Sequence, residues 1–145
     1  MPTTRSLATC LALGLVASGA HADDLVQPLE LMDVFELEYA DDPRISPDGR
    51  HVVYVRTAMD VMEDRRSSTL WWIDVESGEQ RPLTMGGAEH SPRWSPDGQR
   101  LLYVAYDENG AQQLLVRWMD TGDTSSLCQL AEGAGDLSWS PDGRQ

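Results

Sequence analysis

The sequence predicts an all-β fold, a partial β-propeller of about two four-stranded antiparallel blades plus the start of a third. The phrase Ser-Pro-Asp-Gly occurs three times, at residues 46–49, 95–98 and 140–143, with starts 49 and 45 residues apart. A period of about 40–50 residues is typical of one propeller blade. The first two copies are followed by β-branched, leucine and tyrosine runs that favour strands. Each repeat offers four short strands, which is the number in one blade.

The repeated phrase is expected to reverse the chain tightly between two strands. A proline pushes the residue before it toward an extended conformation, so Ser46 can end a strand. Pro47 then presets the first corner of a type I turn and Asp48 suits the second corner, while Gly49 can adopt a positive φ. An apolar residue precedes every copy of the phrase, namely Ile45, Trp94 and Trp139.

The second half of the repeat also recurs. Residues 72–84 and 116–130 both show the pattern of a strand, a glycine turn and another strand. The two repeats differ mainly in one loop, since residues 57–68 correspond to the short stretch 107–110. We expect the longer loop to lie on a propeller face, as a binding loop or as a tolerated surface insertion.

Residues 1–22 are interpreted as a secretion signal. Arg5 provides the positive start, residues 7–20 are small and apolar, and Ala-His-Ala at 20–22 is an A-x-A cleavage site. The apolar run is too short for a stable membrane anchor, and no later stretch approaches spanning length. The sequence therefore predicts an exported protein, periplasmic or secreted, with no membrane span after cleavage.

Two further segments follow the signal. Residues 23–44 form a lead-in segment whose apolar residues have rough helical spacing, so a short helix is expected there. Residues 45–145 form the incomplete propeller domain. Cys128 is the only cysteine after the signal, so no disulfide can form within residues 23–145, although export would permit one with a thiol elsewhere in a longer protein. More often such a residue is a small buried apolar side chain, which is what we expect.

The charge limits the possible partners. The chain has a formal net charge of −13, and all 11 basic residues are arginines. Such a surface repels phosphate backbones, so nucleic-acid binding is disfavoured.

The sequence lacks the motifs of the common catalytic and metal sites, namely G-x-S-x-G, the P-loop, H-E-x-x-H and C-x-x-C. His51 and His90 could each act as a base, but loosely packed histidines are far more common than catalytic ones. The acidic stretch 107–110 could suggest calcium, yet it lacks the spacing of an EF-hand loop, and a hairpin turn explains it. We therefore predict no catalytic residue, no cofactor, no cofactor-binding residue and no metal ligand.

Five tryptophans raise the question of an aromatic binding platform. Trp94 and Trp139 occupy equivalent positions in the repeat, which favours a repeated packing role. Trp71 and Trp72 are adjacent in an expected strand and should therefore face opposite sides of the sheet.

The repeated phrase, with Trp-Ser-Pro-Asp-Gly followed by Leu-Leu-Tyr-Val, resembles the PD40/TolB-type propeller repeat. Residues 31–49, running into 52–56, resemble the opening of bacterial prolyl-oligopeptidase-family (S9) serine peptidases. Within that family, these residues are most similar to the acylaminoacyl-peptidase and dipeptidyl-aminopeptidase-like branch. The same branch is also resembled by two later segments, residues 64–66 ahead of 70–74 and residues 90–98.

The resemblance implies a propeller that caps a C-terminal α/β-hydrolase domain and filters peptides by size. In that family the catalytic serine, aspartate and histidine lie in the hydrolase domain, and no residue of this sequence matches them. We therefore expect the N-terminal fragment of an exported serine peptidase, non-catalytic by itself. Its partners would be peptide substrates, met through the full-length enzyme, and its own hydrolase domain.

The alternative is a TolB-like periplasmic propeller that binds proteins. TolB-like proteins carry an α/β domain ahead of the propeller, and the short lead-in segment leaves no room for one, which favours the peptidase.

Overall fold

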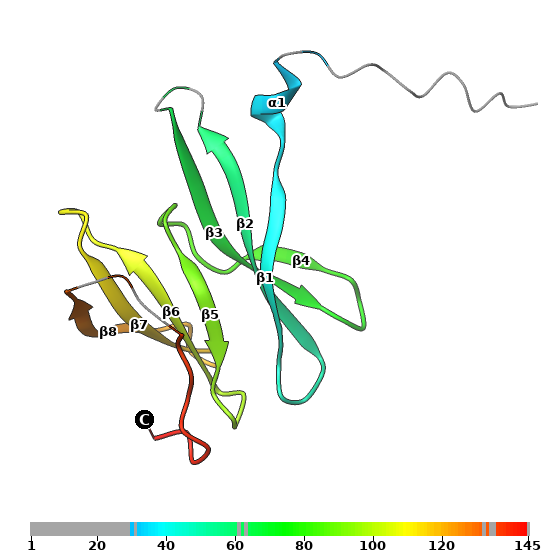
Figure 1. Ribbon diagram of the computed structural model, residues 1–145. Coiled ribbons are helices and arrows are strands. Elements are labelled where there is room, and N and C mark those ends of the chain that lie inside the picture. Colours follow the sequence, from blue (N-terminus) through cyan, green and yellow to red (C-terminus); the bar gives the residue numbers. More distant parts are fainter. Residues whose placement is uncertain are drawn as a thin grey trace, which may run out of the picture.

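Two four-stranded antiparallel sheets make up most of the molecule (Figure 1). The computed structural model describes residues 30, 32–60, 62, 64–131, 133 and 136–144; the expected signal at 1–22 lies outside them. The sheets have the strand orders β1-β2-β3-β4 and β5-β6-β7-β8, so each is a simple meander. The predicted all-β partial propeller with two four-stranded blades is therefore confirmed.

The elements follow the repeat, with one difference at the start of the first sheet. The lead-in segment was expected to reach residue 44, but Tyr39 already pairs with Thr57 in the first sheet. The bounds are α1 (Asp33–Glu36), β1 (Tyr39–Ile45), β2 (His51–Asp60), β3 (Arg65–Asp74), β4 (Gln80–Pro82), β5 (His90–Trp94), β6 (Arg100–Tyr106), β7 (Gln112–Trp118) and β8 (Thr124–Leu130).

The long loop expected at residues 57–68 is mostly sheet, so that prediction is wrong. β2 continues to Asp60 and β3 begins at Arg65, and the register pairs Thr57 with Ser68 and Asp60 with Arg65. The backbone pairing of this extended hairpin outweighs the polar composition that suggested a loop, because a ladder satisfies every second backbone group along each strand.

The Ser-Pro-Asp-Gly turns have the expected geometry and lie along the lower edge of Figure 1. The amide of Gly49 donates to the carbonyl of Ser46 at 2.9 Å, and the equivalent bond closes the other two turns. The serine hydroxyl donates to the aspartate, with 2.6 Å between Ser46 Oγ and Asp48 Oδ1. Gly49, Gly98 and Gly143 have φ values of 74°, 71° and 67°, as predicted.

The two sheets pack face to face around one apolar core. Alternate residues of each strand point to one face, so Val53 and Val55 of β2 lie on the same side as Leu70 of β3. Leu101 and Tyr103 of β6 approach from the second sheet. Val53, Leu70 and Leu101 are fully excluded from solvent.

Each tryptophan that precedes a turn ties its repeat to the one before. Trp94 Nε1 donates to the carbonyl of Arg44 at 3.1 Å, and Trp139 Nε1 donates to the carbonyl of Arg93 at 3.0 Å. Arg44 and Arg93 occupy equivalent positions, so the same bond is made twice. This supports the repeated packing role predicted for these tryptophans.

The adjacent tryptophans face opposite sides of the first sheet, as expected. The Trp72 ring lies 6.0 Å from that of Trp94 in the second sheet. Trp71 lies beneath Arg56, whose guanidinium carbon is 4.3 Å from the ring centroid. Arg56 also forms an ion pair with Glu38.

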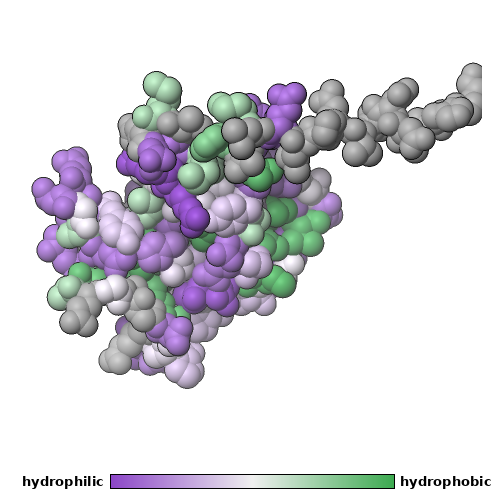
Figure 2. All heavy atoms as spheres, turned by 45° about the horizontal axis from the view of Figure 1, so that its top comes forward, coloured by the Kyte–Doolittle hydropathy of each residue, from purple (hydrophilic) through white to green (hydrophobic). Residues whose placement is uncertain are grey.

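The surface corrects one expectation. Cys128 is exposed because it lies on β8, the edge strand of the second sheet, which is mostly solvent-facing. Figure 2, with the end that holds α1 brought forward, shows mostly hydrophilic side chains and hydrophobic ones gathered at one side. Among the described residues, none of the helices has the length and apolar character needed to cross a bilayer.

Gly98→Ala is expected to lower the free energy of unfolding by about 1–2 kcal/mol, because the left-handed conformation at φ 71° brings a Cβ close to the following carbonyl. The added Cβ would meet Pro47 at 3.4 Å, which is ordinary contact, so the strain comes from the backbone. Urea unfolding monitored by tryptophan fluorescence measures the change. Gly133→Ala, where no positive φ is required, is the matched control, and equal losses in the two variants would contradict the prediction.

Candidate binding cleft between the two sheets

A cleft of about 500 Å³ opens between the two sheets at the end that carries the turns. Its walls come from both repeats, since the first two Ser-Pro-Asp-Gly turns, β3 and the turn after β7 all contribute. The cleft therefore exists only because the sheets pack side by side. The lining residues are Ser46, Asp48, His51, Trp72, Trp94, Asp97, Gly98, Gln99, Met119 and Asp120.

His51 lies in this cleft, at the first position of β2. Its ring stacks on Trp72 with 4.1 Å between centroids. Its Nδ1 lies 3.7 Å from Asp74 Oδ2, which is too long for a hydrogen bond. The hydroxyl of Ser46 donates its proton to the Asp48 carboxylate of the same turn, and so not to the imidazole of His51.

His90 lies in a different cleft, of about 260 Å³, lined by residues of β1, β2 and β3. Its Nδ1 is 3.0 Å from the hydroxyl of its neighbour Ser91. Burial lowers the pKa of His90, and the nearby Asp42 carboxylate opposes this shift. The structure therefore does not bring His51 and His90 into one site, and the prediction that neither is catalytic stays a prediction.

Hydrogen bonds hold the turn carboxylates ionised. The serine hydroxyl of the same turn is the main cause that lowers the pKa of Asp48, Asp97 and Asp142. A backbone amide two residues further on adds to the effect, from Arg50, Gln99 and Arg144 respectively. The cleft therefore carries negative charge from Asp48 and Asp97, beside the carboxylate of Asp120.

The stretch 107–110 forms the turn between β6 and β7, as the hairpin interpretation predicted. Asp107 Oδ1 accepts hydrogen bonds from the backbone amides of Asn109 and Ala111. Its Oδ2 accepts from the side-chain Nε2 of Gln113 and of Gln129, each at 3.3 Å. Within the part of the chain that the structure describes, no group of three or more histidine, cysteine or acidic side chains is placed to hold a metal.

The turn carboxylates predict a loss of stability in acid. A folded-state pKa below the ordinary 3.8 gives stability that is complete above that value and is lost as the pH falls through the folded pKa. Urea midpoints should therefore decrease between about pH 5 and about pH 2. Ser95→Ala removes the main hydrogen bond to Asp97 and should make this decrease shallower. Ser126→Ala, on the exposed strand β8, should leave it unchanged; equal slopes in all three proteins would contradict the assignment.

Comparison with known proteins finds relatives named as peptidases. A peptidase of Bacillus subtilis, YuxL, is 31% identical over 112 residues, which are 77% of this chain and 17% of YuxL. Dipeptidyl-peptidase 5 of Porphyromonas endodontalis is 28% identical over 102 residues, 70% of this chain and 15% of that protein. The chain thus spans about a sixth of the length of these curated relatives. No family model matches the sequence.

Solved structures show the same fold. Acylaminoacyl peptidase of Pyrococcus horikoshii superimposes with a TM-score of 0.66 and 23% identity, over 76% of this chain and 17% of that one. TolB of Acinetobacter baumannii superimposes with a TM-score of 0.56 and 21% identity, over 74% of this chain and 25% of that one. The resemblance drawn from the sequence is therefore confirmed: the two sheets are a partial propeller similar to a segment of acylaminoacyl peptidase, in a chain whose relatives include named peptidases.

Proposed function

We propose that this chain forms the first blades of a propeller in an exported serine peptidase of the S9 prolyl-oligopeptidase family, and that the propeller limits which peptides reach the catalytic domain. The observation that carries the proposal is the match to YuxL over 77% of the chain. The likeness to acylaminoacyl peptidase covers a similar share.

The proposal assigns bond breaking to a hydrolase domain and gives the described sheets the role of a wall. In such a domain a serine attacks the peptide carbonyl, a histidine takes its proton, and an oxyanion hole stabilises the tetrahedral intermediate. The sheets suit a wall because they pack through an apolar core, with fully buried residues contributed from both sides.

The test uses the whole protein that the gene encodes. It should react with a fluorophosphonate probe. It should also hydrolyse short peptides much faster than it hydrolyses a long unfolded protein of the same composition. Residues 1–145 alone should show neither reaction. Absence of labelling and of hydrolysis in the whole protein would overturn the proposal, and equal rates on short and long substrates would overturn the role in size selection.

Export is tested separately. Cleavage after Ala22 predicts that the protein recovered from the periplasm or the medium begins with Asp23. Amino-terminal sequencing of the secreted and cytoplasmic fractions gives the answer. A protein that keeps residues 1–22 and stays in the cytoplasm would contradict export.

The second candidate is a TolB-like module that binds proteins of the cell envelope. The structural likeness to TolB supports it, and a TolB of Alcanivorax borkumensis is 32% identical over 54 residues. That match covers 37% of this chain, about half the share covered by YuxL, so the peptidase is favoured. Stable capture of purified envelope proteins by a whole protein that does not react with the fluorophosphonate would reverse this preference.

A further inference from the structure

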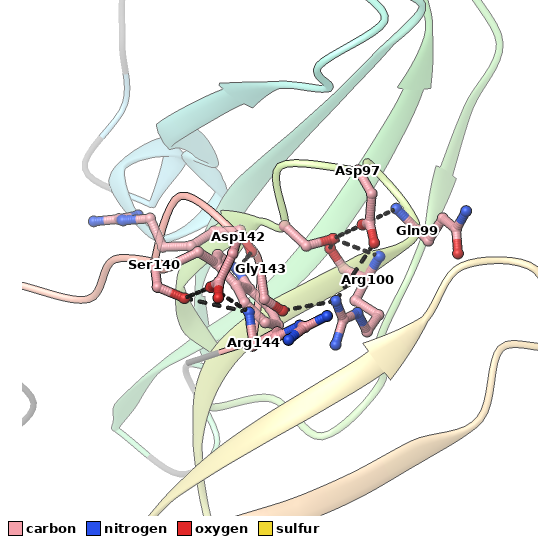
Figure 3. A network of polar contacts seen from close by, with 10 residues as sticks. Asp97, Gln99, Arg100, Ser140, Asp142, Gly143 and Arg144 are labelled. Carbon is pink, nitrogen blue, oxygen red and sulfur yellow. Dashed lines mark hydrogen bonds and ion pairs between the residues drawn. The ribbon is translucent and has the colours of Figure 1, made fainter.

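The second repeat contains an internal arginine contact that the first repeat lacks. Arg100, at the first position of β6, donates from Nη2 to the carbonyl of Gly143 in the next turn at 2.8 Å (Figure 3). Its guanidinium carbon also lies 4.9 Å from the centroid of the Trp139 ring. The guanidinium thus bridges the second sheet to the tryptophan and glycine of the third Ser-Pro-Asp-Gly segment.

In the first repeat, His51 occupies the position that is equivalent to that of Arg100 in the second repeat. Both residues come two positions after the glycine of their turn and begin the following strand. The partners equivalent to Trp139 and Gly143 are Trp94 and Gly98. His51 stacks on Trp72 at 4.1 Å instead, and Trp94 and Gly98 line the 500 Å³ cleft. The cleft therefore lies at the position equivalent to that of the Arg100 guanidinium, with the Trp72 ring, 6.0 Å from that of Trp94, as one of its walls.

We infer that this cleft binds the guanidinium group of an arginine side chain in a peptide, over Trp94 and against the turn of Gly98. The contacts are those that Arg100 makes with Trp139 and Gly143. The charge of the cleft suits a cation, since three carboxylates line it and its lining contains neither arginine nor lysine. One of the three, Asp97, also pairs with Arg100 at 3.4 Å, so Asp48 and Asp120 carry most of this argument. The ligand is thus defined by a contact that the same chain already makes.

A guanidinium fits this site better than an ammonium does. It is planar and weakly hydrated, so it can lie on an indole ring while its edge donates to oxygen atoms. A lysine ammonium is a compact and strongly hydrated charge, and it would lose more solvation in a cleft with two tryptophan walls. The expected order of affinity is arginine, then lysine, then the uncharged isostere citrulline.

The binding experiment uses the purified chain and three small probes, the N-acetyl amides of arginine, lysine and citrulline. Indole N–H signals in nitrogen–proton NMR spectra report on the cleft, and Trp94→Phe assigns the signal of Trp94. The arginine probe should shift the Trp94 signal saturably in the millimolar range and bind at least tenfold more tightly than the citrulline probe. Equal binding of arginine and citrulline would overturn the inference.

His51→Arg tests the site from within. The new side chain should reach Trp94 and Gly98 as Arg100 reaches their equivalents, so the arginine probe should bind at least tenfold more weakly. The variant should also melt at a higher temperature than the parent. Ser126→Arg, which adds a guanidinium on the exposed strand β8 outside the cleft lining, should keep binding within about twofold. Unchanged binding in a folded His51→Arg protein would overturn the inference.

A second pair of variants keeps the test independent of His51. Asp120→Asn removes a charge from the cleft, whereas Asp123→Asn removes one from the same turn outside the cleft lining. Affinity for the arginine probe should fall several-fold in the first variant and stay within twofold in the second. Equal effects of the two changes would show a general response to net charge and would overturn a site in the cleft.

Discussion

Leu70→Ala is expected to lower the free energy of unfolding by about 2–5 kcal/mol. Leu70 is fully excluded from solvent and lies in the apolar cluster shared by both sheets, with Val53 and Leu101. Truncation removes the transfer free energy of the buried atoms and leaves a cavity that two stiff sheets can close only in part.

Urea unfolding of the purified chain, followed by tryptophan fluorescence and circular dichroism, measures the loss. Leu127→Ala is the matched control, because Leu127 is 55% exposed on β8 and removal of the same atoms there opens no cavity. The control should change stability by less than about 1 kcal/mol. Similar losses at the two positions would mean that the sheets do not share a core.

The turns and the two meanders could be predicted because their causes are local. Proline and glycine restrict the backbone at fixed positions, so Pro47 and Gly49 define a turn whatever surrounds them. The alternation of apolar residues then places Val53 and Val55 on one face. The packing role of Trp94 could also be predicted from the sequence, since a residue that recurs at one position of a repeat has a recurring partner.

The extended hairpin and the cleft could not be predicted from local sequence. Polar side chains of the stretch 57–68 suggested a loop, but the backbone of β2 and β3 can pair whatever the side chains are. The exposure of Cys128 depends on β8 being an edge strand, which is a property of the sheet order. The cleft depends on two repeats lying side by side, and its signal in the sequence was the change from arginine to histidine between Arg100 and His51.

Trp94→Ala is expected to lower the free energy of unfolding by about 3 kcal/mol, at the low end of the range for buried aromatic residues because Trp94 is only half-buried. The indole packs against the core and its N–H holds the carbonyl of Arg44 across the two sheets. Trp94→Phe keeps most of the packing and loses the hydrogen bond, so it should lose about 0.5–1.5 kcal/mol.

The pair of variants separates packing from hydrogen bonding in the contact between successive repeats. Trp118→Ala is the control, since Trp118 is 38% exposed and lies outside this contact; its loss should be smaller by at least about 1 kcal/mol. Differential scanning fluorimetry and urea unfolding should rank the variants Ala, Phe and parent in order of rising stability. A Trp94→Phe protein as unstable as Trp94→Ala would assign the whole effect to the bond with Arg44. A Trp94→Ala protein as stable as the parent would mean that the tryptophan of the repeat does not join the blades.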